Sequence, residues 1–414
     1  MAQNEVDVAI VGAGPYGLSI GAHLKQSAID FKVFGHPMDA WKMHMPPGMF
    51  LKSDGPSTNL CGLKHGLSLE QYCELHGIVY DARTPIPLNI FAEYGVAFQA
   101  QLVPLVERVN IRSVQASGGA YALESADGRL FRAKRIIIAV GIYPFRFVPP
   151  EIGHLPPDLY SHSAEYGSVD RLNGMRVAVI GSGASAIDVA AALDDRGITP
   201  TIISRREIIR FQAPPSTTAP SLYHRLRYPD SGIGGGWAHK LYADAPNIVH
   251  RFPKTLRASI LRNALGPSSG WKMKERVLGR IPIFYSQTVR RIYLDRNSIR
   301  IDLATPDRKL TTIEIDHVIA ATGYRTDCEK LEFLAQPLRA RIHTYKGSPI
   351  LSSNFESSSP GLYFVGPASA MSFGPVMRFV FGARFTAHAV TAHLSRISSK
   401  NSWRIRSRQG MTAT

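Results

Sequence analysis

The chain has 414 residues with 48 Lys and Arg against 32 Asp and Glu, which gives a formal net charge of +16. Its apolar fraction of 44% fits a globular protein and excludes a disordered chain, and no apolar run reaches the length of a membrane span. The chain begins almost directly with a strand and no secretory leader, so we expect a cytoplasmic protein.

The basic surplus has two readings, a nucleic-acid or membrane surface and a solvated face that also attracts anionic cofactors. No nucleic-acid-binding motif accompanies the charge, so the second reading is favoured and no nucleic-acid partner is expected. The three cysteines, Cys61, Cys73 and Cys328, form no C-x-x-C pair, which indicates free thiols in a reducing compartment. No metal site is predicted.

The first glycine fingerprint follows an apolar strand at residues 8–11 and precedes a helix predicted over Leu18–Leu24. Gly12, Gly14 and Gly17 have the spacing G-x-G-x-x-G. In this context the first glycine permits a tight turn, the second leaves room for a pyrophosphate and the third allows close packing of helix on strand. The helix start offers free N–H groups to the phosphates, so this stretch predicts a dinucleotide site.

The second strand of this unit is predicted at residues 31–34. It is followed by Gly35-His36 instead of the acid that often binds a ribose. Trp41, a candidate cofactor contact, leads into a loop rich in proline that carries Lys52. Another loop carries Asn59, and a short helix is predicted over residues 68–76.

The pattern then repeats about 170 residues later. Residues 176–180 predict a strand, and Gly181-Ser182-Gly183-Ala184-Ser185-Ala186 forms a second fingerprint with alanine in the third glycine position. A helix to about Leu193 and a strand at 201–204 follow. Two strands that end at a glycine, 136–141 and 318–323, complete the two units.

The sequence therefore predicts an α/β protein with two Rossmann-like dinucleotide-binding domains, the second inserted into the first. The first is expected to comprise residues 1–165 and 310–414. The second, for NADPH, is expected over residues 166–309 with an insertion at about 207–290. That insertion suits a lid, a substrate wall or a homo-oligomer contact, and the sequence does not separate these.

Arg205 and Arg206 stand directly after the second strand of the second unit, where an NAD ribose would require an acid. Two guanidinium groups suit the 2′-phosphate of NADPH through charge-assisted hydrogen bonds. The alternative is a solvated basic turn.

The C-terminal part carries the segment GLYFVGP at residues 361–367, which predicts a strand and a turn at Gly366. Gly374-Pro375 is predicted to open a helix from about Val376, with proline near its first position. These residues are expected to complete the first unit.

Together these motifs resemble the class B flavin-dependent monooxygenases, a family of flavin-containing, N-hydroxylating and Baeyer–Villiger enzymes. The resemblance covers most of the chain and includes His162 and Tyr166, which are similar to the end of the family signature H-x-x-x-Y/F. The upstream Phe and Gly of that signature are missing, and Tyr166 replaces the Trp of Baeyer–Villiger enzymes. The segments MPPGMFLKS and FGPVMRFV look more like the bacterial branch that includes FAD-dependent urate hydroxylase.

The resemblance implies FAD in the first unit, NADPH in the second, and O2 activated as a C4a-(hydro)peroxyflavin that hydroxylates a small organic substrate. Asn59 would bind the peroxyflavin, and the helix starting near Pro375 would direct its positive end at the flavin N1/C2=O. Lys52, Arg325 and Arg378 would orient coenzyme or substrate. The alternatives are a turn asparagine with a satisfied side chain at Asn59 and structural surface charges at the three cations. The implied cofactor contacts are Gly12, Gly14, Gly17, Trp41, Gly181, Ser182, Gly183, Ser185, Arg205, Arg206, Gly366 and Pro375. Two alternatives stay open: a two-dinucleotide flavoprotein reductase or oxidase without oxygenation, and a nucleotide-loaded binding protein.

Overall fold

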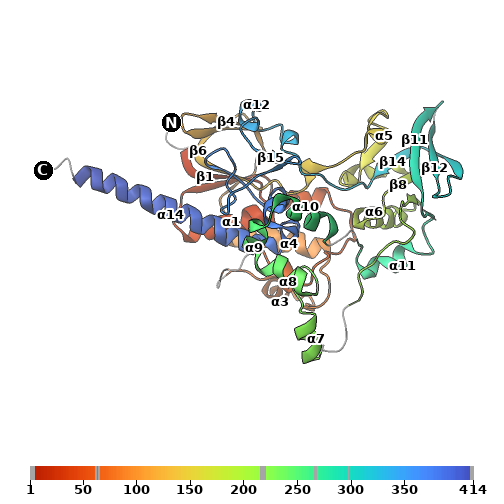
Figure 1. Ribbon diagram of the computed structural model, residues 1–414, viewed down its shortest axis with the longest axis horizontal. Coiled ribbons are helices and arrows are strands. Elements are labelled where there is room, and N and C mark those ends of the chain that lie inside the picture. Colours follow the sequence, from red (N-terminus) through yellow and green to blue (C-terminus); the bar gives the residue numbers. More distant parts are fainter. Residues whose placement is uncertain are drawn as a thin grey trace.

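The computed structural model describes residues 5–60, 63, 66–214, 221–264, 268–296 and 298–410, and Cys61 lies outside them. Two sheets dominate it, and they lie toward opposite ends of the molecule (Figure 1). The strands of the first sheet, in spatial order, are β3 (Val106–Glu107), β2 (Phe31–Phe34), β1 (Glu5–Val11), β6 (Leu130–Ile138), β5 (Ala120–Ser125) and β4 (Ile111–Ser117). The first sheet is mixed, with β5 antiparallel to both β4 and β6, and the second is parallel. β17 (Leu362–Phe364) pairs in parallel with the end of β6, which brings the C-terminal segment GLYFVGP into the first unit as predicted.

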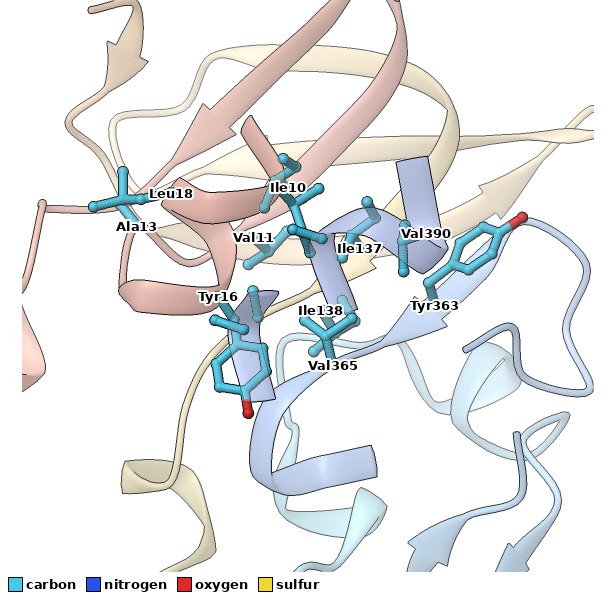
Figure 2. Packing of buried hydrophobic residues seen from close by; sticks show 14 of the residues in the cluster. Ile10, Val11, Ala13, Tyr16, Leu18, Ile137, Ile138, Tyr363, Val365 and Val390 are labelled. Atoms are coloured by element: carbon cyan, nitrogen blue, oxygen red, sulfur yellow. The ribbon is translucent and has the colours of Figure 1, made fainter. Parts of the chain in front are cut away.

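The core of the first unit lies between this sheet and two helices, α1 (Pro15–Gln26) and α14 (Gly382–Gly410), which pack against each other. Figure 2 shows Ile10, Ile137 and Val365 packed together from β1, β6 and the end of β17. All three are almost fully buried. Burial of such aliphatic side chains stabilises the fold by roughly 1.5–3 kcal/mol each.

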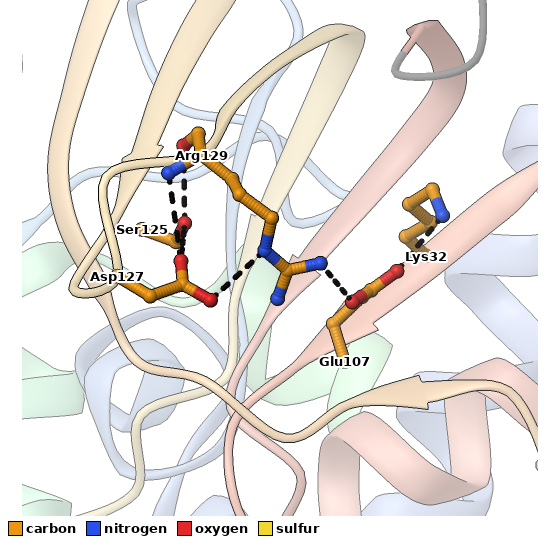
Figure 3. A network of polar contacts seen from close by, with 5 residues as sticks. All are labelled: Lys32, Glu107, Ser125, Asp127 and Arg129. Atoms are coloured by element: carbon orange, nitrogen blue, oxygen red, sulfur yellow. Dashed lines mark hydrogen bonds and ion pairs between the residues drawn. The ribbon is translucent and has the colours of Figure 1, made fainter.

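A polar network joins the edge of the same sheet (Figure 3). Glu107 accepts from Lys32 Nζ at 3.0 Å and from Arg129 at 2.9 Å, and Arg129 also binds Asp127 at 2.9 Å. These cations, Lys32 first, hold the pKa of the Glu107 carboxyl below its usual value. The network connects β2 and β3 to the hairpin between β5 and β6.

The second sheet has, in spatial order, β10 (Ile283–Phe284), β9 (Thr201–Ile203), β8 (Val177–Ile180), β14 (His317–Ala320) and β7 (Tyr160–His162), all parallel. An antiparallel meander of β11 (Thr288–Asp295), β12 (Ser298–Ala304) and β13 (Leu310–Ile315) precedes β14. Helix α6 (Ala184–Asp194) follows β8, as α1 follows β1. Since β7 and β14 pair within this sheet, the second unit extends beyond the expected range 166–309 on both sides.

The remaining helices and strands are short connections and covering elements. They are α2 (Asp39–Met43), α3 (Leu69–Leu75), α4 (Leu88–Leu102), α5 (Pro150–Gly153), α7 (Leu222–Arg227), α8 (Trp237–Asp244), α9 (Pro246–Arg251), α10 (Lys254–Asn263), α11 (Lys274–Val277), α12 (Gln336–Arg339), β15 (Thr344–Tyr345), β16 (Ser348–Pro349) and α13 (Ala370–Phe373). The predicted helix over 68–76 is α3, and Ser68 with Gln71 forms its capping box.

The insertion between β9 and β10 forms α7 to α11. Helices α9 and α10 pack on α13, which belongs to the C-terminal part of the first unit. Arg257 on α10 is buried and donates to Ser372 O at 3.0 Å. The insertion therefore starts in the second unit and packs, through α9 and α10, as a wall on the C-terminal part of the first unit.

The helix predicted from about Val376 does not start there in the structure, so this prediction was wrong. Residues Pro375–Arg378 form a single 3₁₀ turn, Phe379 is extended, and α14 begins at Gly382. The buried Tyr16 hydroxyl donates to Met377 O at 3.1 Å and to Phe379 O at 2.8 Å. The Tyr16 hydroxyl therefore supports the turn and the extended residue that precede α14, and the helix starts later than the sequence pattern predicts.

In the part of the chain that the structure describes, no helix is long and apolar enough to cross a membrane.

Candidate functional site: two dinucleotide cradles

The first cradle lies at the carboxyl end of β1. A side chain at Gly12 would overlap the carbonyl of Ala139, which follows β6, so Gly12 allows the ends of β1 and β6 to lie close together. A side chain at Gly17 would overlap the carbonyl of Gly12, so Gly17 allows α1 to pack against the end of β1. Gly14 differs, because a Cβ there meets no atom within 4 Å. The empty space above Gly14, at the start of α1, fits a pyrophosphate group.

The second cradle repeats this geometry at the end of β8. Gly181 has φ +138°, and a Cβ there would overlap the carbonyl of Ala321 at the end of β14. Gly183 caps α6 with extended backbone. The carboxyl ends of β8 and β14 lie side by side where the strand order of the sheet reverses, which is where open α/β sheets bind ligands.

A cleft of about 790 Å³ opens above this second cradle. It is lined by the predicted residues Gly181, Ser182, Gly183, Ser185, Arg205 and Arg206. All six members of the predicted coenzyme set from the second unit therefore lie around one space. The volume lies within the range that small-molecule and cofactor sites have in proteins.

Arg205 and Arg206 are exposed on the turn after β9. Ser204 shapes that turn, because its Oγ accepts from Arg206 N and donates to Arg206 O, both at 3.0 Å. The two arginines thus stand at the end of the cleft beyond the fingerprint glycines. This is the place that a 2′-phosphate takes when the pyrophosphate lies on the cradle.

Sequence reasoning missed other cleft residues, among them Phe147 and Gln287. Phe147 comes from the linker between the sheets, which carries no motif. Gln287 lies beyond β10, and its buried Oε1 has no hydrogen-bond partner among the described residues. A free acceptor in the cleft fits a donor such as an adenine amino group.

His162 and Tyr166, the signature residues, hold the fold together instead of lining the cleft. His162 Nδ1 accepts from Ala164 N at 3.1 Å, so Nε2 carries the proton and donates to Gly323 O at 3.0 Å. Burial lowers the pKa of His162, which agrees with a neutral ring. The Tyr166 hydroxyl donates to Ala192 O at 3.1 Å on α6. The signature therefore fixes the end of β14 and the helix that follows the fingerprint.

The three predicted catalytic residues, Lys52, Asn59 and Arg378, each bind a different partner. Lys52 Nζ pairs with Asp188 on α6 at 3.0 Å. Arg378 is exposed and donates to Leu261 O on α10 at 3.1 Å.

The Asn59 amide lies in a local turn. Asn59 Nδ2 donates to Pro56 O at 3.2 Å, and its Oδ1 accepts from Leu69 N at 2.6 Å at the start of α3. These contacts agree with the structural alternative for a turn asparagine, and the catalytic role stays a prediction.

Among the remaining predicted cofactor contacts, Trp41 is half-buried and packs edge-on against Phe91 at 4.7 Å. Gly366 has φ +65°, and a Cβ there would lie 3.3 Å from the Tyr16 ring. Pro375 is buried in the turn that the Tyr16 hydroxyl holds. Gly366 and Pro375 therefore both lie beside Tyr16, two residues beyond Gly14.

Comparison with known proteins agrees with this architecture. The pyridine nucleotide-disulphide oxidoreductase family matches residues 6–227. An uncharacterized CzcO-like oxidoreductase from Geobacillus kaustophilus is 26% identical over 210 residues, covering 47% of this chain and 53% of the relative. The chain thus matches about half the length of that relative, whereas the CzcO oxidoreductase of Bacillus subtilis is 23% identical over 374 residues, 87% of this chain and 91% of that protein.

Two further relatives bear on the chemistry. A ferredoxin–NADP reductase from Thermus thermophilus is 27% identical over 213 residues, 51% of this chain and 56% of that protein. The ornithine N-hydroxylase KtzI from Kutzneria sp. 744, solved with reduced FAD, NADP⁺ and L-ornithine, has a TM-score of 0.76 at 15% identity. The likeness covers 95% of this chain and 100% of KtzI, so the expected two-dinucleotide fold of class B monooxygenases is confirmed. Because the family match spans more than half of the sequence, the protein belongs to the pyridine nucleotide-disulphide oxidoreductase family and is an oxidoreductase.

Proposed function

We propose that the protein is an FAD-dependent monooxygenase that uses NADPH and O2 to hydroxylate a small organic substrate. The observation that carries this proposal is the pair of cradles in one chain, with Gly14 open at the first and Arg205 and Arg206 beside the second. The fold that it shares with ornithine N-hydroxylase over almost its whole length supports it.

FAD belongs to the first cradle, where Gly14 leaves room for its pyrophosphate and α1 directs free N–H groups toward it. When bound, the flavin supplies the hydride acceptor and the activation of O2. The protein's part is to bind, orient and exclude water. The wall made by α9 and α10 against α13 serves that exclusion, because it covers the C-terminal segment that completes the first unit.

NADPH belongs to the second cleft. The backbone at Gly181 and Gly183 receives the pyrophosphate, and Arg205 and Arg206 bind the 2′-phosphate. The expected preference for NADPH over NADH follows from these two cations.

Disulfide reduction, which the family name includes, does not fit the cysteines. The sequence has no C-x-x-C pair. Of the described cysteines, Cys73 in α3 and Cys328 after β14 are both buried, and burial raises the pKa of Cys328 to about 12. A thiol held protonated in this way is a poor redox nucleophile.

The second candidate is a reductase that passes electrons from NADPH through the flavin to another acceptor. The similarity to ferredoxin–NADP reductase over half of the chain favours it. Its product would be a reduced carrier, without oxygen transfer.

One experiment separates the two. The flavin-loaded protein is given NADPH and ¹⁸O2 with a panel of amines, sulfides, ketones and purines, and NADPH use, hydrogen peroxide and ¹⁸O in the product are measured together. The monooxygenase proposal expects ¹⁸O in one product class, with amines the first candidates, and less peroxide when that substrate is present. Fast electron transfer to a dye or to ferredoxin, with no ¹⁸O in any product, would establish the reductase instead.

A further inference from the structure

The linker between the two sheets is fastened to the end of β14 by its backbone. Phe147 N donates to Gly323 O at 3.0 Å, and Arg325 N donates to Phe145 O at 2.8 Å. The Thr322 hydroxyl also donates to the carbonyl of Phe147. These bonds hold residues 145–147 and 322–325 side by side at the edge of the second cleft.

This pairing places a cation over the face of an aromatic ring. The guanidinium carbon of Arg325 lies 3.4 Å from the centre of the Phe147 ring, and both residues line the cleft. A guanidinium stacked in this way keeps its N–H groups in the plane of the ring's face, free to bind other acceptors. Arg325 has no carboxylate partner among the described residues, and it is exposed and lines the cleft.

The order of the strands fixes where along a dinucleotide this cation lies. Arg205 follows β9, the fingerprint follows β8, and Arg325 follows β14, and these three strands are neighbours in that order. With the 2′-phosphate at Arg205 and the pyrophosphate at the fingerprint, the nicotinamide half must extend over β14. Arg325 and Phe147 therefore stand beside the half of the coenzyme that NADPH and NADH share.

We propose that Arg325, presented by the Phe147 ring, binds the phosphate and ribose of the nicotinamide half and so positions the nicotinamide. Arg325 is a positioning residue for both coenzymes, whereas Arg205 and Arg206 select for NADPH. This inference rests on the proposed use of a pyridine nucleotide in the second cleft, and it does not depend on whether oxygen is transferred.

Isothermal titration calorimetry with two probes tests the proposed role of Arg325. NADP⁺ contains both halves of the coenzyme, whereas 2′,5′-ADP contains only the adenosine half with its 2′-phosphate. Arg325→Met is expected to weaken NADP⁺ binding by roughly tenfold, the effect of one charge-assisted contact, and to leave 2′,5′-ADP binding unchanged. Arg205→Ala should weaken both probes alike.

Three variants complete the design. Arg325→Lys keeps the charge without the stack and should recover part of the NADP⁺ affinity. Phe147→Leu should lose part of it, because the guanidinium loses its platform. Arg291→Met is the matched control, since Arg291 also stacks on a ring, that of Tyr293 at 4.7 Å, but does not line the cleft.

Steady-state kinetics add a second readout. Arg325→Met should raise the KM for NADPH and for NADH by the same factor, in contrast to Arg205→Ala. Equal loss of NADP⁺ and 2′,5′-ADP binding, or no change in either, would overturn the assignment of Arg325. If wild-type protein binds neither probe, the proposed coenzyme site itself has failed, and that result is separate from any effect of Arg325.

Discussion

Lys52 Nζ lies 3.0 Å from Asp188 Oδ2, and this ion pair joins a loop of the first unit to the helix that follows the second fingerprint. The Asp188 side chain is only 4% exposed, and burial raises the pKa of its carboxyl. The family resemblance implies that Lys52 orients a coenzyme or a substrate. In the structure its partner is Asp188, so Lys52 connects the two units.

The loop around Lys52 makes further contacts of the same kind. Lys272 lies over the Phe50 ring at 4.5 Å, and Arg276 donates to Gly48 O at 3.2 Å. Each contact crosses from the first unit to the insertion. The proline-rich loop therefore holds the flavin unit and the coenzyme unit together. We call its contacts through Gly48, Phe50 and Lys52 the clasp.

The first prediction concerns this clasp. Lys52→Met should destabilise the protein by on the order of 3 kcal/mol, because it leaves the buried Asp188 carboxylate without its cation. Burial raises the pKa of the Asp188 carboxyl, so the neutral form is favoured in the folded state and the loss should be larger at about pH 8 than at about pH 4. Urea unfolding at the two pH values measures this difference.

The double variant Lys52→Met/Asp188→Asn is the control. Removal of the carboxylate charge should restore most of the lost stability and abolish its dependence on pH. A Lys52→Met protein with wild-type stability but a raised substrate KM would instead support the substrate role predicted from the sequence.

The second prediction concerns the first cradle. Gly14→Val should fold, since Gly14 has φ −89° and a Cβ there meets no atom within 4 Å, but it should lose FAD because the side chain takes the pyrophosphate space. The ratio of flavin to protein absorbance and the unfolding midpoint of the apoprotein measure the two effects. Gly270→Val is a matched control, because Gly270 also has open space around its Cβ and belongs neither to the first fingerprint nor to the lining of the second cleft. Full flavin retention by Gly14→Val would refute the assignment of FAD to this cradle.

Strands, fingerprint helices and the repeat could be predicted from the sequence because they are local patterns. Phe31–Phe34 is β2 as predicted, and the second fingerprint with Arg205 and Arg206 lines one cleft. These features depend on spacing that the chain shows directly.

What could not be predicted depends on contacts between distant residues. The hydroxyl of Tyr16 occupies two carbonyls more than 350 residues away, and so delays the start of α14. Lys52 meets Asp188 across 136 positions, and Phe147 meets Arg325 through a linker without a motif. No local pattern records such pairs, so their roles emerge only from the fold.

The third prediction concerns acid stability. His317 is buried with its Nε2 2.9 Å from the Ser161 hydroxyl, and burial lowers its pKa from 6.5 to about 4. Because the unfolded chain binds the proton more readily, stability is full above about pH 6.5 and falls as the pH drops toward 4, by on the order of 3 kcal/mol.

His317→Asn should therefore show a smaller fall in unfolding free energy between about pH 7 and pH 4.5 than the wild type. His343→Asn, at an exposed position, is the control and should keep the wild-type slope. Identical slopes for wild type and His317→Asn would show that the buried ring does not control the acid sensitivity.

The fourth prediction concerns Asn59 and the proposed oxygen transfer. Its Oδ1 locks the start of α3 through Leu69 N, so Asn59→Ala should lose about 1 kcal/mol of stability, whereas Asn59→Asp keeps this acceptor. Both variants lack the amide donor. If that donor serves oxygen transfer, both should release more hydrogen peroxide per NADPH oxidised while the rate of flavin reduction stays near the wild-type value. A stability loss in Asn59→Ala with an unchanged peroxide yield in both variants would assign Asn59 to the loop alone, and the search for the oxygen-stabilising donor would move to the turn at Pro375 beside Tyr16.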